Sequence, residues 1–418
     1  MDKIVDFVDC IRPTYDDDSI DRLHYFWTCL LTIIFSTTIA ACQFGGTSVQ
    51  CWTPAEFTDS WERYAERNCF MENVYILQDG NRRREILYYP WIPFLLAVQG
   101  ALFYLPHVVW TQLNIITGLN LKSIIRRVKT TDNHKFVARK IAYQLSKSLK
   151  IQEELGGENG AQIIGNASDT AGDWSQNLIN SVLRCGRSSG FYMTAVYLVV
   201  KFMNLINVVG QFLFLNKFFG FGWTHIWGWE ILLQSLNDPF GSGTTWTHRD
   251  QYESITSANE QLLWNGLFPR LMFCSLELKA LGHNRQVTLQ CILWINMLNE
   301  KVFLILWWWF VVVAILTLFN LVYWTAAMLI PSAQVSFVAR YLRIRHLIHT
   351  HSNMQMVRRF VTLAVKTDGV LVTRILSENI GDLYITDVYE ILWWRFHEEH
   401  YGGTVGGVVT SDTVESRL

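Results

Sequence analysis

The chain of 418 residues is half apolar, and its formal net charge is −1. A near balance of acidic and basic residues argues against a nucleic-acid-binding protein, which would carry a basic excess. The apolar residues gather into long runs without charge instead of recurring at the period of a surface helix or strand. The composition therefore predicts a protein that crosses a membrane several times.

The first 22 residues are expected to form a short helix followed by an acidic linker. Apolar side chains recur at helical spacing on one face of the helix, and three aspartates share the opposite face, namely Asp2, Asp6 and Asp9. Pro13 ends the pattern, and the acidic residues 16–18 follow it. Taken alone, these residues are equally compatible with an amphipathic helix at the membrane surface.

Four apolar segments are long enough to cross a bilayer, which takes about 20 residues in a helix. We expect these spans at residues 23–44, 86–113, 190–216 and 302–330. Four crossings put both chain termini on the same side of the membrane. The connecting segments are then residues 45–85, 114–189 and 217–301, and a tail follows at residues 331–418.

The second span begins with an aromatic and proline-rich stretch, which we treat as a structural signature made of Tyr88, Tyr89, Pro90, Trp91, Pro93 and Pro106. Aromatic rings at the start of a span favour the level of the lipid headgroups. Each proline removes a backbone donor, and in lipid the freed carbonyl must find a partner on a neighbouring helix or in water. We therefore expect this span to lie inside a bundle.

Positive charge marks the loop at residues 114–189 and the tail at residues 331–418 as cytoplasmic, because basic residues near span ends stay inside. The basic residues that lie in the first part of this loop, after the second span, are Lys122, Arg126, Arg127, Lys129, Lys135, Arg139, Lys140, Lys147 and Lys150. The loops at residues 45–85 and 217–301 are then extracellular. Asn166 starts a glycosylation sequon that this topology leaves unmodified. Arginines and helical apolar spacing in the tail predict a cytoplasmic helical domain.

Four of the eight cysteines fall in the two extracellular loops, where disulfides persist. They are Cys51 and Cys69 in the first loop, and Cys274 and Cys291 in the second. Four cysteines allow three pairings. The other cysteines are expected to be small buried thiols.

Lys201 is a lone charge inside the third span, where it costs at least about 2.5 kcal/mol. Two interpretations stay open: the side chain faces the bundle or water, or its stem reaches back to the cytoplasmic headgroups. His397 and His400 lack the spacing of a zinc motif, which favours a solvated helix face over a metal site. We find no paired carboxylates, activated nucleophile or phosphate-binding loop, and so expect neither an enzyme nor a cofactor.

The stretch YYPWIPFLLAVQGALFYLP, which begins at Tyr88, resembles the YYQWVPF signature of the innexins, the gap-junction proteins of invertebrates. Pro90 stands where that family usually has Gln. Segments at their usual places extend the resemblance over nearly the whole chain: DRLHY, FPR, INMLNEKVFLILWWWF and DGVLVTRIL. Two cysteines in each outer loop are also similar to innexins, whereas connexins have three.

The resemblance implies an all-α membrane protein, a four-transmembrane-helix bundle with disulfide-linked extracellular loops and a helical cytoplasmic domain. It implies the bridges Cys51–Cys291 and Cys69–Cys274. It also implies that the N-terminal segment folds into the pore mouth, so that the pore is lined by Asp2, Asp6, Asp9, Gly45 and Gly46.

The function that the resemblance implies is a gap-junction channel in the plasma membrane that passes ions and small molecules passively. The expected partners are membrane lipid, further copies in a homo-oligomeric ring such as an octamer or other innexins in a mixed ring, and a docked channel of the opposing cell. Two alternatives stay open: an undocked hemichannel that releases small molecules to the exterior, and a non-conducting adhesion protein.

Overall fold

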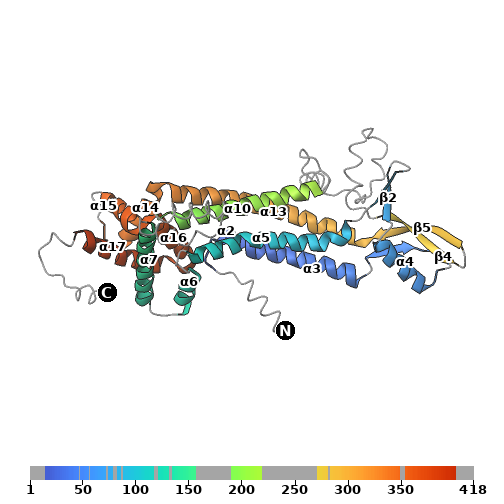
Figure 1. Ribbon diagram of the computed structural model, residues 1–418, viewed down its shortest axis with the longest axis horizontal. Coiled ribbons are helices and arrows are strands. Elements are labelled where there is room, and N and C mark those ends of the chain that lie inside the picture. The colour runs from blue at the N-terminus through green and yellow to red at the C-terminus, as the bar shows by residue number, and fades with distance from the viewer. Residues whose placement is uncertain are drawn as a thin grey trace, which may run out of the picture. The chain divides into compact units, whose positions relative to one another are not determined.

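The structure is a computed structural model that describes residues 15–46, 48–55, 57–71, 74–78, 82–85, 88–116, 121–130, 134–156, 190–218, 271–280, 283–348 and 354–401. Asp2, Asp6, Asp9 and Asn166 lie outside these described residues. Figure 1 labels the helices and strands. The chain divides into two compact units. We call residues 1–26, 105–205 and 316–418 the helical unit, and residues 27–104 and 206–315 the sheet unit.

Four helical segments of the described chain are long and apolar enough to cross a membrane: Ser19–Gly45, Tyr89–Asn114, Tyr192–Lys217 and Trp294–Leu329. The first consists of α2 (Ser19–Arg22), a π-helix (Leu23–Thr28) and α3 (Cys29–Gly45). The second consists of a 3-10 turn (Tyr89–Trp91) and α5 (Ile92–Ile116). The third and fourth are α10 (Tyr192–Phe218) and α13 (Trp294–Leu329). The expected mostly helical, four-span fold is confirmed.

Helix α13 starts at Trp294, well before the start expected at Val302. Glu300 and Lys301, which we took to lie outside the span, continue the helix, with 3.8 Å between Lys301 Nζ and Glu300 Oε1. Asn296 and Asn299 are buried, and the Nδ2 group of Asn299 donates to Oδ1 of Asn296 over 3.3 Å. The helix therefore begins directly after the strand that ends at Leu293, and not after the last charged residue before the span.

The sheet unit contains an antiparallel sheet of five strands that the sequence reasoning did not anticipate. The strands are β1 (Val49–Trp52), β2 (Val74–Gln78), β3 (Arg82–Glu85), β4 (Leu271–Ala280) and β5 (His283–Leu293). Their order is β1-β5-β4-β2-β3, so strands from both expected extracellular loops pair in one sheet. Helix α4 (Asp59–Met71) contacts β1 and β4.

The helical unit combines the expected cytoplasmic loop with the tail. The loop supplies α6 (Leu121–Thr130) and α7 (His134–Gly156). The tail supplies α14 (Pro331–Ile344), α15 (Met354–Phe360), a π-helix (Val361–Val365), α16 (Lys366–Ile380) and α17 (Asp382–Tyr401). These helices share one apolar core, to which Leu145, Phe360, Leu371 and Tyr389 belong. Because α7 packs on α17, the loop and the tail fold together and not as separate domains.

Candidate functional site

The two disulfides of the sheet unit join Cys51 to Cys291 and Cys69 to Cys274. This is the pairing that the resemblance implies. Cys51 on β1 and Cys291 on β5 are directly opposed in the strand register. Cys69 lies near the end of α4, and its bond to Cys274 fastens that helix to β4. Each bridge therefore ties the first expected extracellular loop to the second.

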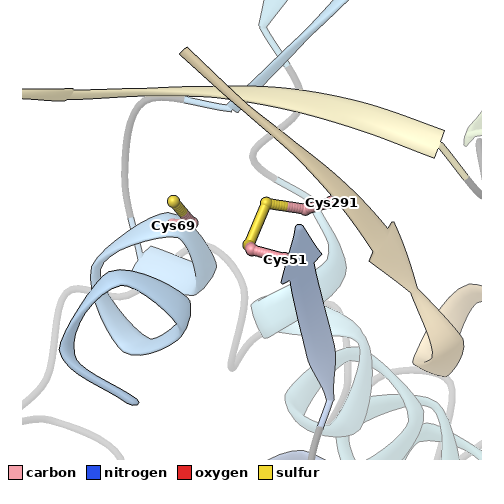
Figure 2. Close-up of side chains that lie close together, drawn as sticks. All are labelled: Cys51, Cys69 and Cys291. Atoms are coloured by element: carbon pink, nitrogen blue, oxygen red, sulfur yellow. A yellow bond between two sulfur atoms is a disulfide. The ribbon is translucent and has the colours of Figure 1, made fainter. Parts of the chain in front are cut away.

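The two disulfides lie next to each other. The sulfur atoms of Cys51, Cys69 and Cys291 are all within 4.8 Å of one another. Figure 2 shows the bond between Cys51 and Cys291 beside the side chain of Cys69. A disulfide sulfur is not the thiolate that binds a metal, so this group of cysteines is a covalent junction and not a metal centre. The disulfides therefore join β1 to β5 and α4 to β4 at one buried point.

The signature at the start of the second span supports this junction. Tyr89 is buried, and its hydroxyl donates a hydrogen bond of 2.7 Å to the carbonyl of Phe70, the residue after Cys69. Trp91 is exposed, in keeping with a ring at the headgroup level. Pro90 lies in the first turn of the 3-10 helix, where the missing N–H costs no helical bond.

The carbonyls freed by two prolines find partners on other spans, as expected for a helix inside a bundle. Pro93 cannot donate to the carbonyl of Tyr89, which accepts a 2.8 Å hydrogen bond from Nε2 of Gln43. Pro106 cannot donate to the carbonyl of Leu102, which accepts a 3.1 Å hydrogen bond from Nδ2 of Asn207. Side chains of the first and third spans thus supply the hydrogen-bond donors that the prolines of the second span lack.

In the helical unit, Lys201 is buried at the centre of a charged cluster. Its Nζ atom lies 2.8 Å from Oδ2 of Asp21 and 3.2 Å from Oδ2 of Asp18. Only 1% of the lysine side chain is exposed, so it faces the bundle interior. The alternative, a stem that reaches back to the headgroups, is wrong.

Polar side chains from two spans complete the coordination of both aspartates. Asn320 and Trp324 on α13 donate to Oδ2 of Asp18 over 2.6 and 3.1 Å. Tyr197 and Asn204 on α10 donate to Asp21 over 3.2 and 3.0 Å. Burial alone would raise the pKa of Asp18, but Lys201, Asn320 and Trp324 outweigh it and lower this pKa to about 2. Asp18 is therefore ionised at neutral pH.

A second charged group holds the residue before Asp18. The carboxylate of Asp17 lies 3.5 Å from Nε of Arg22 and 3.5 Å from Nδ1 of His107 on α5. Arg22 also donates to Oδ1 of Asn379 on α16, whose Nδ2 group donates to the carbonyl of Asp17. The linker that precedes the first span is thus fixed by two spans and by the tail. Sequence reasoning placed an acidic linker here but identified none of these partners.

The tail also caps the N-terminus of the third span. The carboxylate of Asp368 on α16 accepts hydrogen bonds from the backbone N–H groups of Met193 and Thr194, at 3.1 and 2.9 Å. These N–H groups belong to the first turn of α10 and have no partner within their own helix. Burial raises the pKa of Asp368, although the bonds from Thr194 and Met193 oppose the rise. The DGVLVTRIL segment therefore contains a cap for a membrane span.

The remaining residues expected at the site are not brought together. Gly45 is the last residue of α3, and a β-carbon at Gly46 would lie 3.0 Å from the carbonyl oxygen of Cys42. Cys29 is a buried thiol, whereas Cys42 is exposed, contrary to the expectation of burial. His397 packs against Tyr401, and His400 against Phe396. The pore-lining role of Gly45 and Gly46 remains a prediction.

Comparisons with known proteins match these features. The Innexin family model matches residues 17–396. Innexin unc-9 of Caenorhabditis elegans is 31% identical over 410 residues, which cover 94% of this chain and 96% of that protein. Innexin-3 of the same organism is 30% identical over 93% of this chain and 85% of its own length, and Innexin eat-5 is 27% identical over 95% and 91%. The chain belongs to the innexin family, the subunits of gap-junction channels in the plasma membrane.

Proposed function

We propose that this subunit assembles into a ring around a wide pore, and that two rings dock across the gap between adjacent cells. An octamer of identical chains is one such ring, and a mixed ring with other innexins is another. Ions and small molecules then move down their gradients, with selectivity set by pore width and lining charge. Residues 114–189, the tail and both termini are cytoplasmic in this arrangement.

The observation that carries the docking proposal is the covalent junction of the sheet unit. Its bridges close intervals of 240 and 205 residues, which removes much of the freedom of the unfolded loops. Strands of both loops then form one sheet that can present a fixed surface. A rigid surface loses less conformational entropy on binding than separate loops would.

The anchored linker supports a pore-lining role for the residues that precede it. Asp17 and Asp18 are held by the contacts described above, so the chain leaves the bundle at a defined point. From there the N-terminal segment is short enough to fold back into the pore mouth. Asp2, Asp6 and Asp9 then face the lumen, and Gly45 and Gly46 line the pore at the opposite end of the first span.

Dye transfer tests the docked channel against the two alternatives. A docked channel passes a small fluorescent dye between paired cells that express the protein. An undocked hemichannel instead leaks dye from single cells, and a non-conducting adhesion protein increases cell pairing without either. Paired cells that adhere but exchange no dye would overturn the proposed channel function.

A further inference from the structure

Helix α6 is strongly amphipathic and follows the second span closely. Its apolar residues Leu121, Ile124, Ile125 and Val128 are buried in the core of the helical unit. The opposite face exposes Lys122, Arg126 and Arg127. The helix is therefore held by its apolar face and presents a basic face outward.

Helix α7 extends this basic surface. Lys135, Arg139, Lys140 and Lys147 are all exposed. Between Leu121 and Lys150, Asp132 is the single acidic residue of the sequence. Within the described residues, no carboxylate pairs with Lys135, Arg139 or Lys140, whereas Lys150 pairs with Glu399 on α17 at 3.1 Å. The surface formed by α6 and the first half of α7 thus carries a net positive charge.

A groove of about 80 Å³ lies between the two helices on this surface. Ile124, Val137 and Ile141 line it from the core side with at most 6% of each residue exposed, and Gln144 adds a polar side chain. Arg127 and Lys140 line the same groove, one from each helix. Phe136, which is 57% exposed, adds an aromatic ring to the wall. Two cations beside an exposed aromatic ring match a ligand that has both an anionic group and an apolar chain.

The chain length between the span and the groove restricts where such a ligand comes from. Helix α5 ends at Ile116 and α6 begins at Leu121, five residues later. A fully extended chain covers at most roughly 18 Å over that interval. Arg127 lies six residues into α6, about 9 Å along the helix axis. Clusters of basic side chains that follow a span so closely in the chain attract anionic lipids of the adjacent leaflet.

We propose that the groove between α6 and α7 binds a phospholipid with a net negative headgroup, drawn from the leaflet on the same side of the membrane. The phosphate lies between Arg127 and Lys140, and the glycerol end of the acyl chains packs on the exposed ring of Phe136. A free anion would leave this ring uncovered. This inference goes beyond conduction, and it depends on the proposed topology only for the name of the leaflet.

The first test compares ligands on the full-length protein in a neutral detergent. The probes are dioctanoyl phosphatidylserine, its headgroup alone as glycerophosphoserine, and dioctanoyl phosphatidylcholine, each titrated by native mass spectrometry. We expect phosphatidylserine to bind at least about tenfold more tightly than the other two. Equal binding of phosphatidylcholine, or of the headgroup alone, would overturn the proposal. Displacement of the lipid by a hexaglutamate peptide at equal concentration would also overturn it, in favour of an acidic protein partner.

The second test uses two variants that lose the same charge. Arg127→Gln with Lys140→Gln removes both cations of the groove, and Lys122→Gln with Lys147→Gln removes two exposed lysines outside it. We expect the first pair to weaken phosphatidylserine binding about tenfold or more, and the second less than about twofold. Equal losses would show that the lipid responds to diffuse surface charge. If the first variant fails to fold, the comparison of ligands on the unaltered protein still decides.

Discussion

The Nζ atom of Lys201 on the third span lies 2.8 Å from Oδ2 of Asp21 at the start of the first. Both side chains are buried, and Asp18 adds a second carboxylate at 3.2 Å. The buried charge of Lys201 in the third span is thus paired with residues far away in the chain. Such a pair holds two spans together strongly only while all of its members are present, because a remaining buried charge is costly.

Replacing Lys201 by Met is expected to destabilise the protein by about 3–5 kcal/mol, because Asp18 and Asp21 are left without their cation. The melting temperature of the purified protein in detergent measures the loss. Lys150→Met is the matched control, since Lys150 is 57% exposed in its pair with Glu399 and such pairs contribute about 0–1 kcal/mol. Adding Asp21→Asn to Lys201→Met should restore part of the stability. A Lys201→Met protein as stable as the control would contradict the role of the cluster.

The carboxyl group of Asp17 predicts a dependence of stability on pH. Burial raises its pKa to about 6, and Asp21 and Asp16 add to the rise against the opposing effect of His107. In the unfolded chain this carboxyl loses its proton near pH 3.8. Between pH 3.8 and 6 the folded state therefore holds more protons, and stability falls as pH rises.

Asp17→Asn should remove this fall. We expect the melting temperature of the variant, relative to that of the unaltered protein, to increase as pH rises from 4 to about 6. Above that pH the difference between the two melting temperatures should stay constant. Asp18→Asn is the control, because the pKa of Asp18 is lowered to about 2 and its stabilisation is lost only below this range. A His107→Gln background removes the side chain that lies 3.5 Å from the Asp17 carboxylate. Parallel curves for the Asp17 variant and the unaltered protein would refute the assignment.

Replacing any one of Cys51, Cys69, Cys274 and Cys291 by Ser is expected to abolish coupling between cells. Loss of a disulfide in a small extracellular framework typically costs about 2–5 kcal/mol, which here disorders the proposed docking surface. Junctional conductance between paired cells measures the effect, with surface biotinylation to verify that each variant reaches the membrane. If all four variants couple cells normally, the docking role is wrong.

The two variants of the Cys69–Cys274 bridge should also differ from each other. Cys274→Ser frees the Cys69 sulfur within 4.8 Å of the Cys51–Cys291 bond, where a thiolate can attack it and exchange partners. Cys69→Ser instead frees the sulfur of Cys274, which is not one of the three sulfurs that lie within 4.8 Å of one another. Peptide mapping without reduction should therefore find a new bond to Cys69 in the first variant and the intact Cys51–Cys291 bond in the second.

The proposed topology makes Asn166 cytoplasmic, so we expect it to carry no glycan. An epitope tag placed after Leu418 should be reached by antibody only in permeabilised cells, because the tail lies on the same side. Tags in the loops at residues 45–85 and 217–301 should be labelled on intact cells. A glycan on Asn166 that an endoglycosidase removes would invert the topology.

The pore mouth is expected to prefer cations, because rings of Asp2, Asp6 and Asp9 raise the local cation concentration. The preference should be modest in a wide pore, since charges more than about 8 Å away are screened at physiological salt. The reversal potential of single channels in asymmetric KCl should move toward zero when all three become Asn. A control with three amide substitutions in the cytoplasmic loop, at Glu153, Glu154 and Glu158, should not change it. Identical potentials for the Asn variant and the unaltered channel would exclude these aspartates from the pore.

The number of spans and the need for polar partners inside the bundle were readable from the sequence. A long apolar run without charge is stable in few environments other than lipid. A proline within it leaves a backbone carbonyl without its helical donor, and a lysine adds a charge, so each needs a polar partner in any fold. The need for polar partners at Pro93, Pro106 and Lys201 was therefore predictable without a structure.

Only the tertiary structure decided which residues are these polar partners. Gln43, Asn207 and Asp21 are ordinary residues in their own segments, and they become partners because separate helices bring them within hydrogen-bonding distance. The sheet was missed for the same reason, since β1 and β3 have four residues each and are stable only when paired with β5 and β2. Helical length in lipid depends on each segment alone, whereas pairing depends on contacts between segments far apart in the chain.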